Sequence, residues 1–145
     1  MSEERKLIEK LKRIESLFSG ATTKGEKTAA ANAIDRVLQR LQKLQKNDPP
    51  VEYKFTLQNE WSKRLFTALL RRYGLKPYRY YRQRHTTVMV KISVSFVNDT
   101  LWPEFMELDK TLTTYLEEIT NRVISESIHS DSSETVIKED SKQLN

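Results

Sequence analysis

The stretch Pro49-Pro50-Val51-Glu52-Tyr53-Lys54-Phe55-Thr56-Leu57 decides the fold. After the two prolines, apolar and polar side chains alternate with a period of two, which predicts a half-buried β-strand over residues 51–57. Before the prolines, apolar residues recur every three or four positions, as they do on helices. Proline ends a helix because it lacks a backbone N–H and restricts the residue before it. The chain therefore divides into a helical part before Asp48-Pro49-Pro50 and a mixed part after it.

Two helices are predicted over residues 1–48. The first spans residues 3–18, and Gly20 is expected to end it in the left-handed conformation. The second begins after Thr23, which forms a capping box with Glu26. The apolar seams follow spacings of four and three, through Leu7, Leu11, Ile14 and Phe18 on the first helix and Ala30, Ile34, Val37, Leu41 and Leu44 on the second. Together they predict an antiparallel helical hairpin, which needs to dock on the rest of the chain or on another copy because two helices alone make a thin core.

The mixed part continues with a helix and two strands. Asn59 is the expected N-cap of a helix over residues 60–73, and Gly74 is its expected left-handed terminator. Residues 77–81 and 87–94 are rich in aromatic and β-branched side chains, which predicts the two strands of a hairpin.

A long last helix is predicted to begin between Ser95 and Thr100 and to run to about Ile128. Pro103 fits its first turn if Thr100 is the cap, and kinks the helix if Ser95 is. Residues 129–145 combine serines with acidic residues, which is typical of a disordered tail. The predicted fold class is therefore α+β. An N-terminal antiparallel helical hairpin precedes a β-α-β-β-α unit over residues 51–128, with a small three-stranded sheet and a long C-terminal helix.

Charge is distributed unevenly along the chain. The net charge is +5, but residues 61–98 contain nine basic residues and no acidic one, whereas residues 99–145 contain four basic and eleven acidic residues. A block of one sign attracts polyanions or acidic protein surfaces. The alternative that the acidic third folds back and neutralises the basic block internally stays open.

The alternation also assigns side chains to the two faces of the sheet. The apolar residues of the strands, together with Tyr78 and Tyr80, are expected to face the core. The outer face then carries Lys54, Thr56, Arg79, Tyr81, Thr87, Met89, Lys91 and Ser93. A shift of one residue in register would exchange Arg79 and Tyr81 with Tyr78 and Tyr80.

A basic surface with aromatic rings is typical of nucleic-acid-binding sheets, in which cations hold phosphates and rings stack on bases. A single tyrosine is more often a core ring with its hydroxyl at the surface. The cluster, with six basic residues between Arg71 and Arg84, favours binding. The predicted binding residues are Arg71, Arg72, Arg79, Tyr81, Arg82, Arg84 and Lys91.

Catalysis lacks its usual groups. The chain contains no cysteine, which excludes disulfides, thiolate chemistry and Cys-based zinc sites. His85 lies among arginines with no carboxylate nearby in the sequence. Glu104 and Glu107 are spaced to share a metal, but no histidine follows at metal-site spacing. We therefore expect no enzyme, no catalytic or metal-binding residues and no cofactor.

The segments Lys6–Ile14 and Thr22–Ala31 resemble a helical-hairpin domain of unknown function found in bacterial and prophage proteins. The segments Trp61–Phe66, Arg71–Tyr80 and Leu101–Phe105 are similar to the region that follows this hairpin in such proteins. The resemblance covers roughly residues 5–128. It implies a bacterial setting and brings no activity and no site residues.

The sequence predicts a non-enzymatic protein that binds DNA or RNA electrostatically, with little sequence specificity. The alternative is an interaction or assembly protein, in which the seams of the second and last helices form a homodimer and the basic block receives an acidic protein partner. No apolar run approaches the twenty residues of a membrane span, and the charged N-terminus is unlike a signal peptide. A cytoplasmic location without a membrane partner is expected.

Overall fold

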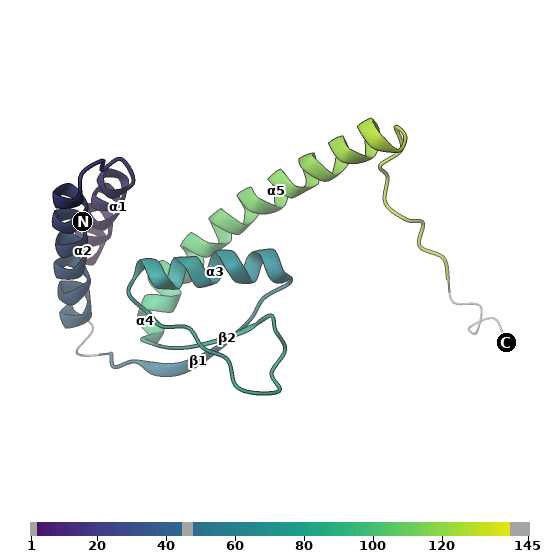
Figure 1. Ribbon diagram of the computed structural model, residues 1–145. Helices are drawn as coiled ribbons and strands as arrows, with labels where there is room; N and C mark the ends of the chain where they lie inside the picture. The colour runs from purple at the N-terminus through teal and green to yellow at the C-terminus, as the bar shows by residue number, and fades with distance from the viewer. Residues whose placement is uncertain (1–2, 45–47, 140–145) are drawn as a thin grey trace. The chain divides into compact units, whose positions relative to one another are not determined.

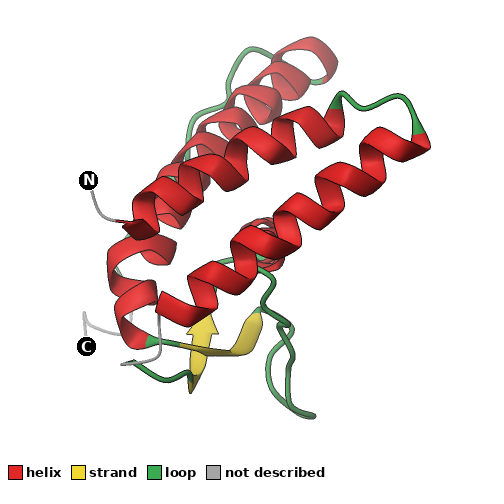
Figure 2. Cartoon of the chain, turned by 90° about the vertical axis from the view of Figure 1, so that its left-hand side faces the viewer, coloured by secondary structure: helices red, strands yellow, loops and turns green. Residues whose placement is uncertain are grey.

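The N-terminal hairpin consists of helix α1 (Glu3–Ser19) and helix α2 (Lys24–Leu44), which lie side by side (Figures 1 and 2). In this computed structural model the described residues are 3–44 and 48–139. The chain forms two compact units, Met1–Met106 and Glu107–Asn145. Leu7 and Leu11 of α1 and Val37 and Leu41 of α2 are buried in the core of the first unit. The hairpin therefore docks on the rest of its own unit.

Local hydrogen bonds set the turn between the two helices. The Thr23 hydroxyl accepts the backbone N–H of Glu26 at 3.1 Å, and the Glu26 carboxylate accepts the N–H of Thr22 at 3.2 Å. The capping box is confirmed, except that Glu26 reaches Thr22 instead of Thr23. The left-handed conformation expected for Gly20 is wrong. Its N–H still bonds to the Ser16 carbonyl at 3.3 Å, so the helix simply runs on to the turn.

The second helix ends at Leu44. Residues 45–47, over which it was expected to continue, lie outside the described residues. The carboxylate of Asp48 accepts the backbone N–H of Ser95 at 2.9 Å. The side-chain hydrogen bond of Ser95 and then this backbone hydrogen bond lower the pKa of Asp48. The contact ties the start of the sheet to the segment that follows it.

The sheet contains two antiparallel strands, β1 (Val51–Thr56) and β2 (Thr87–Ile92), paired from Val51 opposite Ile92 to Thr56 opposite Thr87. The predicted third strand over residues 77–81 is wrong. A single bridge joins Tyr78 to Met89, with N–H to carbonyl distances of 2.8 and 2.7 Å. The ladder cannot extend, because Pro77 has no N–H and the N–H of Tyr80 is taken by the side chain of Gln83.

Helix α3 (Glu60–Arg72) has the predicted ends. The Asn59 side chain accepts the N–H of Ser62 at 2.9 Å, and Gly74 has φ +73°. The N–H groups of Gly74 and Leu75 bond to the carbonyls of Arg71 and Leu70, which is the Schellman arrangement. The helix packs Phe66 and Leu70, both without exposed surface, into the core.

The last helix starts earlier than predicted. Ser93 is the N-cap of a short helix α4 (Val94–Phe96), a π-helical turn η1 (Val97–Leu101) follows, and α5 (Trp102–Ser127) continues from it. Pro103 is the second residue of α5. Proline has no N–H and clashes with the carbonyl four residues earlier, so the wider turn before it lets the helix pass without a break.

Several facing assignments were wrong at the sheet edges. Val94 is exposed because it belongs to α4, and Val51 is exposed at the start of β1, although both were expected in the core. Thr87, Met89 and Ser93 were expected on the outer face and are buried. Gln83 of the loop after Tyr78 contacts the sulfur of Met89, so this loop covers part of the outer face.

The second unit consists of the rest of α5 and residues that follow it. In its described part, residues 107–139, none is buried, and residues 129–139 form no helix or strand. No helix within the described ranges is long and apolar enough to cross a membrane.

Candidate nucleic-acid interface

The outer face of the sheet carries two lysines and a carboxylate, to which two tyrosines of the following loop donate hydrogen bonds. On β1 the outward residues are Glu52 and Lys54, and the strand register sets them opposite Lys91 and Met89. Residues that pair directly across strands point to the same face, so the bridge between Tyr78 and Met89 brings Tyr78 to the outer face. We call Lys54, Tyr78, Tyr80 and Lys91 the tyrosine face.

The inward positions expected for Tyr78 and Tyr80 are therefore wrong, whereas Arg79 and Tyr81 are exposed, as expected. Their rings lie edge to face, with centroids 5.6 Å apart. Both hydroxyls donate to the same carboxylate oxygen of Glu52, Tyr78 at 2.5 Å. These hydrogen bonds, from Tyr78 first and then Tyr80, lower the pKa of Glu52, and the charge of Lys91 adds to the effect. The carboxylate thus stays charged and holds the tyrosine pair in place.

A shallow basic pocket lies beside β2, between helix α3 and the segment around Tyr78. Lys63, Thr67 and Arg71 lie four residues apart on α3 and therefore share one side of the helix. Together with Pro77, Tyr78, Arg79, Thr87 and Val88 they line a pocket of about 190 Å³. We call this the cation pocket. Its lining has three cationic side chains, three side chains with a hydroxyl and no carboxylate, which is suited to a phosphate group. Tyr78 belongs to both the pocket and the tyrosine face.

The remaining predicted residues of the loop are exposed. The Tyr81 side chain is 91% exposed, and the Arg82 guanidinium carbon lies 5.8 Å from its ring centroid. Arg82 has φ 73°, which turns the chain back toward β2. Arg84 is also exposed. These residues extend the positive surface beyond the cation pocket.

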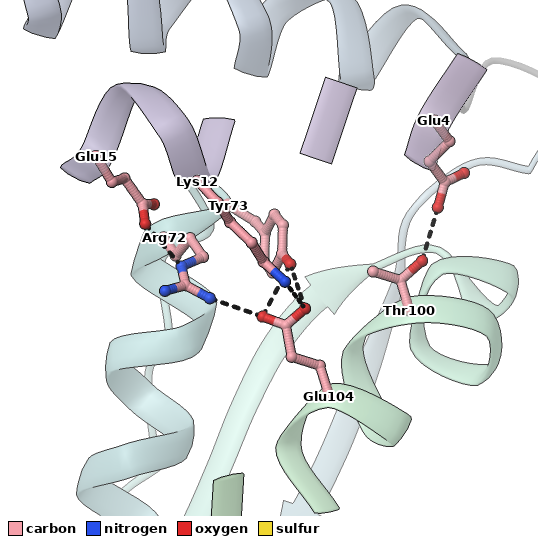
Figure 3. A network of polar contacts seen from close by, with 7 residues as sticks. All are labelled: Glu4, Lys12, Glu15, Arg72, Tyr73, Thr100 and Glu104. Carbon is pink, nitrogen blue, oxygen red and sulfur yellow. Dashed lines mark hydrogen bonds and ion pairs between the residues drawn. The ribbon is translucent and has the colours of Figure 1, made fainter. Parts of the chain in front are cut away.

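Arg72 is placed elsewhere, although it was predicted with the binding residues. Its Nε lies 3.0 Å from a Glu15 oxygen of α1, and its Nη1 lies 2.8 Å from a Glu104 oxygen of α5 (Figure 3). Lys12 and the hydroxyl of Tyr73 converge on the same Glu104 carboxylate, at 3.3 and 2.9 Å. We call these five residues the Glu104 network. Sequence reasoning missed it, because its members are up to 92 positions apart and no local pattern connects them.

In the Glu104 network, burial and charge have opposite effects on the pKa of Arg72 and the same effect on the pKa of Tyr73. Burial by itself would lower the pKa of Arg72, but the charges of Glu15 and Glu104 outweigh it and raise the pKa. Burial and the same Glu104 carboxylate raise the pKa of Tyr73. Arg72 therefore stays charged and Tyr73 stays protonated. Because Arg72 pairs with both Glu15 and Glu104, it links α1, α3 and α5 within the first unit. Its guanidinium is therefore not available to bind a phosphate.

His85 is exposed, and its Nε2 lies 3.7 Å from a carboxylate oxygen of Glu60, which is also exposed. This carboxylate was not foreseen from the sequence, because Glu60 starts α3 and is distant along the chain. Among residues 3–44 and 48–139, no group of three or more histidine, aspartate and glutamate side chains is arranged to hold a metal ion.

Comparisons with family models, curated proteins and solved structures found no match for the chain. The resemblance to the bacterial and prophage hairpin family stays a prediction.

Proposed function

We propose that the chain binds nucleic acid without catalysing a reaction, through the cation pocket and the tyrosine face. The observation that carries the proposal is that Tyr78 joins three clustered cations to an aromatic pair at one edge of the sheet. A phosphate in the pocket would be held by Lys63, Arg71 and Arg79, while a neighbouring base stacks on Tyr80, which is half exposed. Stacking needs unpaired bases, so single strands are expected to bind better than duplexes.

The predicted residues have different roles in this proposal. Arg71 and Arg79 contact phosphate in the pocket, and Lys91 contacts phosphate beside the tyrosine pair. Tyr81, Arg82 and Arg84 steer and extend binding from the exposed loop. Arg72 has no direct role, because Glu15 and Glu104 occupy its guanidinium.

The test is a salt titration of binding to labelled single-stranded RNA, single-stranded DNA and duplex DNA. The variant combines Lys63→Ala, Arg71→Ala and Arg79→Ala. Its matched control combines Lys6→Ala, Lys10→Ala and Arg13→Ala, which removes the same charge from exposed positions of α1. We expect the pocket variant to reduce the slope of log affinity against log salt by about 2, and the control to leave it nearly unchanged. No binding of the unaltered chain at low salt would refute the proposal.

A second variant separates stacking from charge. Tyr80→Leu is expected to weaken single-strand binding by about tenfold, in line with the loss of one stacked base. It should leave binding to polyphosphate, which has charge but no bases, unchanged. If the pocket variant weakens polyglutamate and RNA equally and Tyr80→Leu changes neither, the basic surface instead serves an acidic protein partner.

A further inference from the structure

One carboxylate lies beside the tyrosine face, although the lining of the cation pocket has none. Glu52 is exposed on β1, directly across the strand pair from Lys91. The hydroxyls of Tyr78 and Tyr80 both donate to its Oε2, and they leave its Oε1 to accept from another donor. A charged carboxylate repels phosphate and accepts N–H groups. The surface therefore has one part suited to a phosphate and another part suited to a hydrogen-bond donor.

Tyr78 connects these two parts. Its side chain lines the cation pocket, while its hydroxyl donates to Glu52 at 2.5 Å. The two parts thus lie about one side chain apart, which is also the span from the phosphate of a nucleotide to its base. Tyr80 donates to the same carboxylate, so Glu52 lies at the hydroxyl end of the ring on which we place a base. The polar edge of a base stacked on Tyr80 comes within hydrogen-bond reach of Glu52 Oε1.

We propose that Glu52 makes the site prefer guanine at the stacked position, an inference that rests on the proposed binding of single strands. Guanine has two neighbouring N–H donors on its Watson–Crick edge, the ring N1–H and the 2-amino group, which match a carboxylate. Adenine and cytosine have an amino group beside a ring nitrogen whose lone pair repels the carboxylate. Uracil and thymine have one N–H between two carbonyls. Guanine therefore gains most from Glu52.

The carboxylate also limits which strands can benefit and by how much. In a duplex the Watson–Crick edge of guanine is already paired with cytosine, so only an unpaired guanine offers both donors to Glu52. Because the tyrosines occupy Oε2, the expected discrimination is at the low end for a base contact, about fivefold. Phosphate contacts still supply most of the affinity.

The first experiment measures binding of the full chain to short labelled oligouridine in which one central nucleotide is guanosine or adenosine. Adenosine controls for the stronger stacking of a purine. We expect the guanosine strand to bind about fivefold more tightly than the adenosine strand. If both strands bind with the same affinity, the guanine preference is refuted while the proposed function stands. If no oligonucleotide binds at low salt, both proposals fail.

Glu52→Gln tests whether the preference comes from this carboxylate. The amide keeps a carbonyl oxygen for the tyrosine hydroxyls but presents an N–H group to the donors of guanine. We expect equal affinities for the guanosine and adenosine strands, and no loss of affinity for plain oligouridine, because a negative charge has been removed. The matched control is Glu60→Gln, which removes the same charge from an exposed position on α3 and should keep the preference. A preference that survives Glu52→Gln would overturn the assignment.

A direct readout of the contact is the side-chain carboxyl chemical shift of Glu52, followed by NMR while each strand is added. The guanosine strand is expected to move this signal further than the adenosine strand does at equal saturation, because only guanine places two donors on the carboxylate. Equal movement with the two strands would mean that guanine does not contact Glu52.

Discussion

The two units of the chain treat apolar surface in opposite ways. The first gathers apolar residues from α1, α2, α3, both strands and the start of α5 into one core. The described part of the second has a regular apolar seam and no buried residue. Charge divides at the same place, since residues 1–106 contain 21 basic and 11 acidic residues and residues 107–145 contain four and nine. The first unit buries its apolar residues in one core, whereas the described part of the second unit leaves its apolar residues at least partly exposed.

The largest expected contrast is between an apolar-to-alanine substitution in the first unit and one in the second. Phe66→Ala is expected to destabilise the first unit by about 3–5 kcal/mol, because Phe66 has no exposed surface and contacts Phe55 and Phe105. Leu116→Ala in α5 should change the stability of the first unit by less than about 0.5 kcal/mol. Chemical denaturation followed by tryptophan fluorescence measures both. A similar loss of stability in the two variants would contradict the difference in burial between the two units.

Salt is expected to weaken nucleic-acid binding by the first unit. If three phosphates are contacted, single-strand affinity should fall about 20-fold between 50 and 200 mM salt. Fluorescence anisotropy measures this dependence. An affinity that does not change with salt would show that phosphate contacts do not govern binding.

The Glu104 network gives a moderate effect. Arg72→Met leaves the partly buried carboxylates of Glu15 and Glu104 without their shared cation, and we expect a loss of about 1–2 kcal/mol after allowing for its 30% exposure. Arg122→Met, on the exposed side of the second unit, is the control and should be nearly neutral. The denaturation midpoints of the two variants, each compared with that of the unaltered chain, measure the two effects. Equal midpoints would contradict the role given to Arg72.

The smallest effect concerns protonation of Glu52. Its pKa is lowered in the folded chain, so the stability from the tyrosine hydrogen bonds is present above the ordinary carboxyl pKa and is lost as pH falls through the lowered value. Combining Tyr78→Phe with Tyr80→Phe should raise the pKa of Glu52 toward its ordinary value, and Tyr115→Phe in α5 should not. Carboxyl chemical shifts followed by NMR against pH report this directly. An unchanged Glu52 titration in the double variant would mean that the tyrosine hydroxyls do not hold the carboxylate.

Local patterns predicted the elements well wherever a few neighbouring residues determine the backbone. Asn59, Gly74 and the pair Thr23 and Glu26 end or start helices as expected, because each acts on N–H or carbonyl groups within five positions of it. The strand over residues 51–57 was recognised for the same reason, since alternation needs only adjacent residues. The last helical segment begins at Val94, one residue before the predicted range, and the π-helical turn over residues 97–101, whose Val97 and Leu101 are buried, was not predicted.

The candidate site was only partly predictable. The sequence located the basic and aromatic residues between Arg71 and Lys91, but it assigned the tyrosines to the wrong face. Register decides the face, and here one backbone bridge at Tyr78 and one carboxylate at Glu52 select it. The cation pocket needs Lys63 and Arg79 to meet across the gap between a helix and a loop, which no local spacing encodes.

Local sequence patterns suffice to predict the helical hairpin, the caps at Thr23, Asn59 and Gly74, the change to a period of two after Pro50 and the separation of charge along the chain. These follow from local backbone chemistry and from counting. Tertiary structure alone decided that Tyr78 and Tyr80 face outward, that Arg72 pairs with Glu15 and Glu104, and that the sheet stops at two strands. Each of these depends on which distant groups satisfy a buried charge or a backbone hydrogen bond, and that choice is made only when the chain packs.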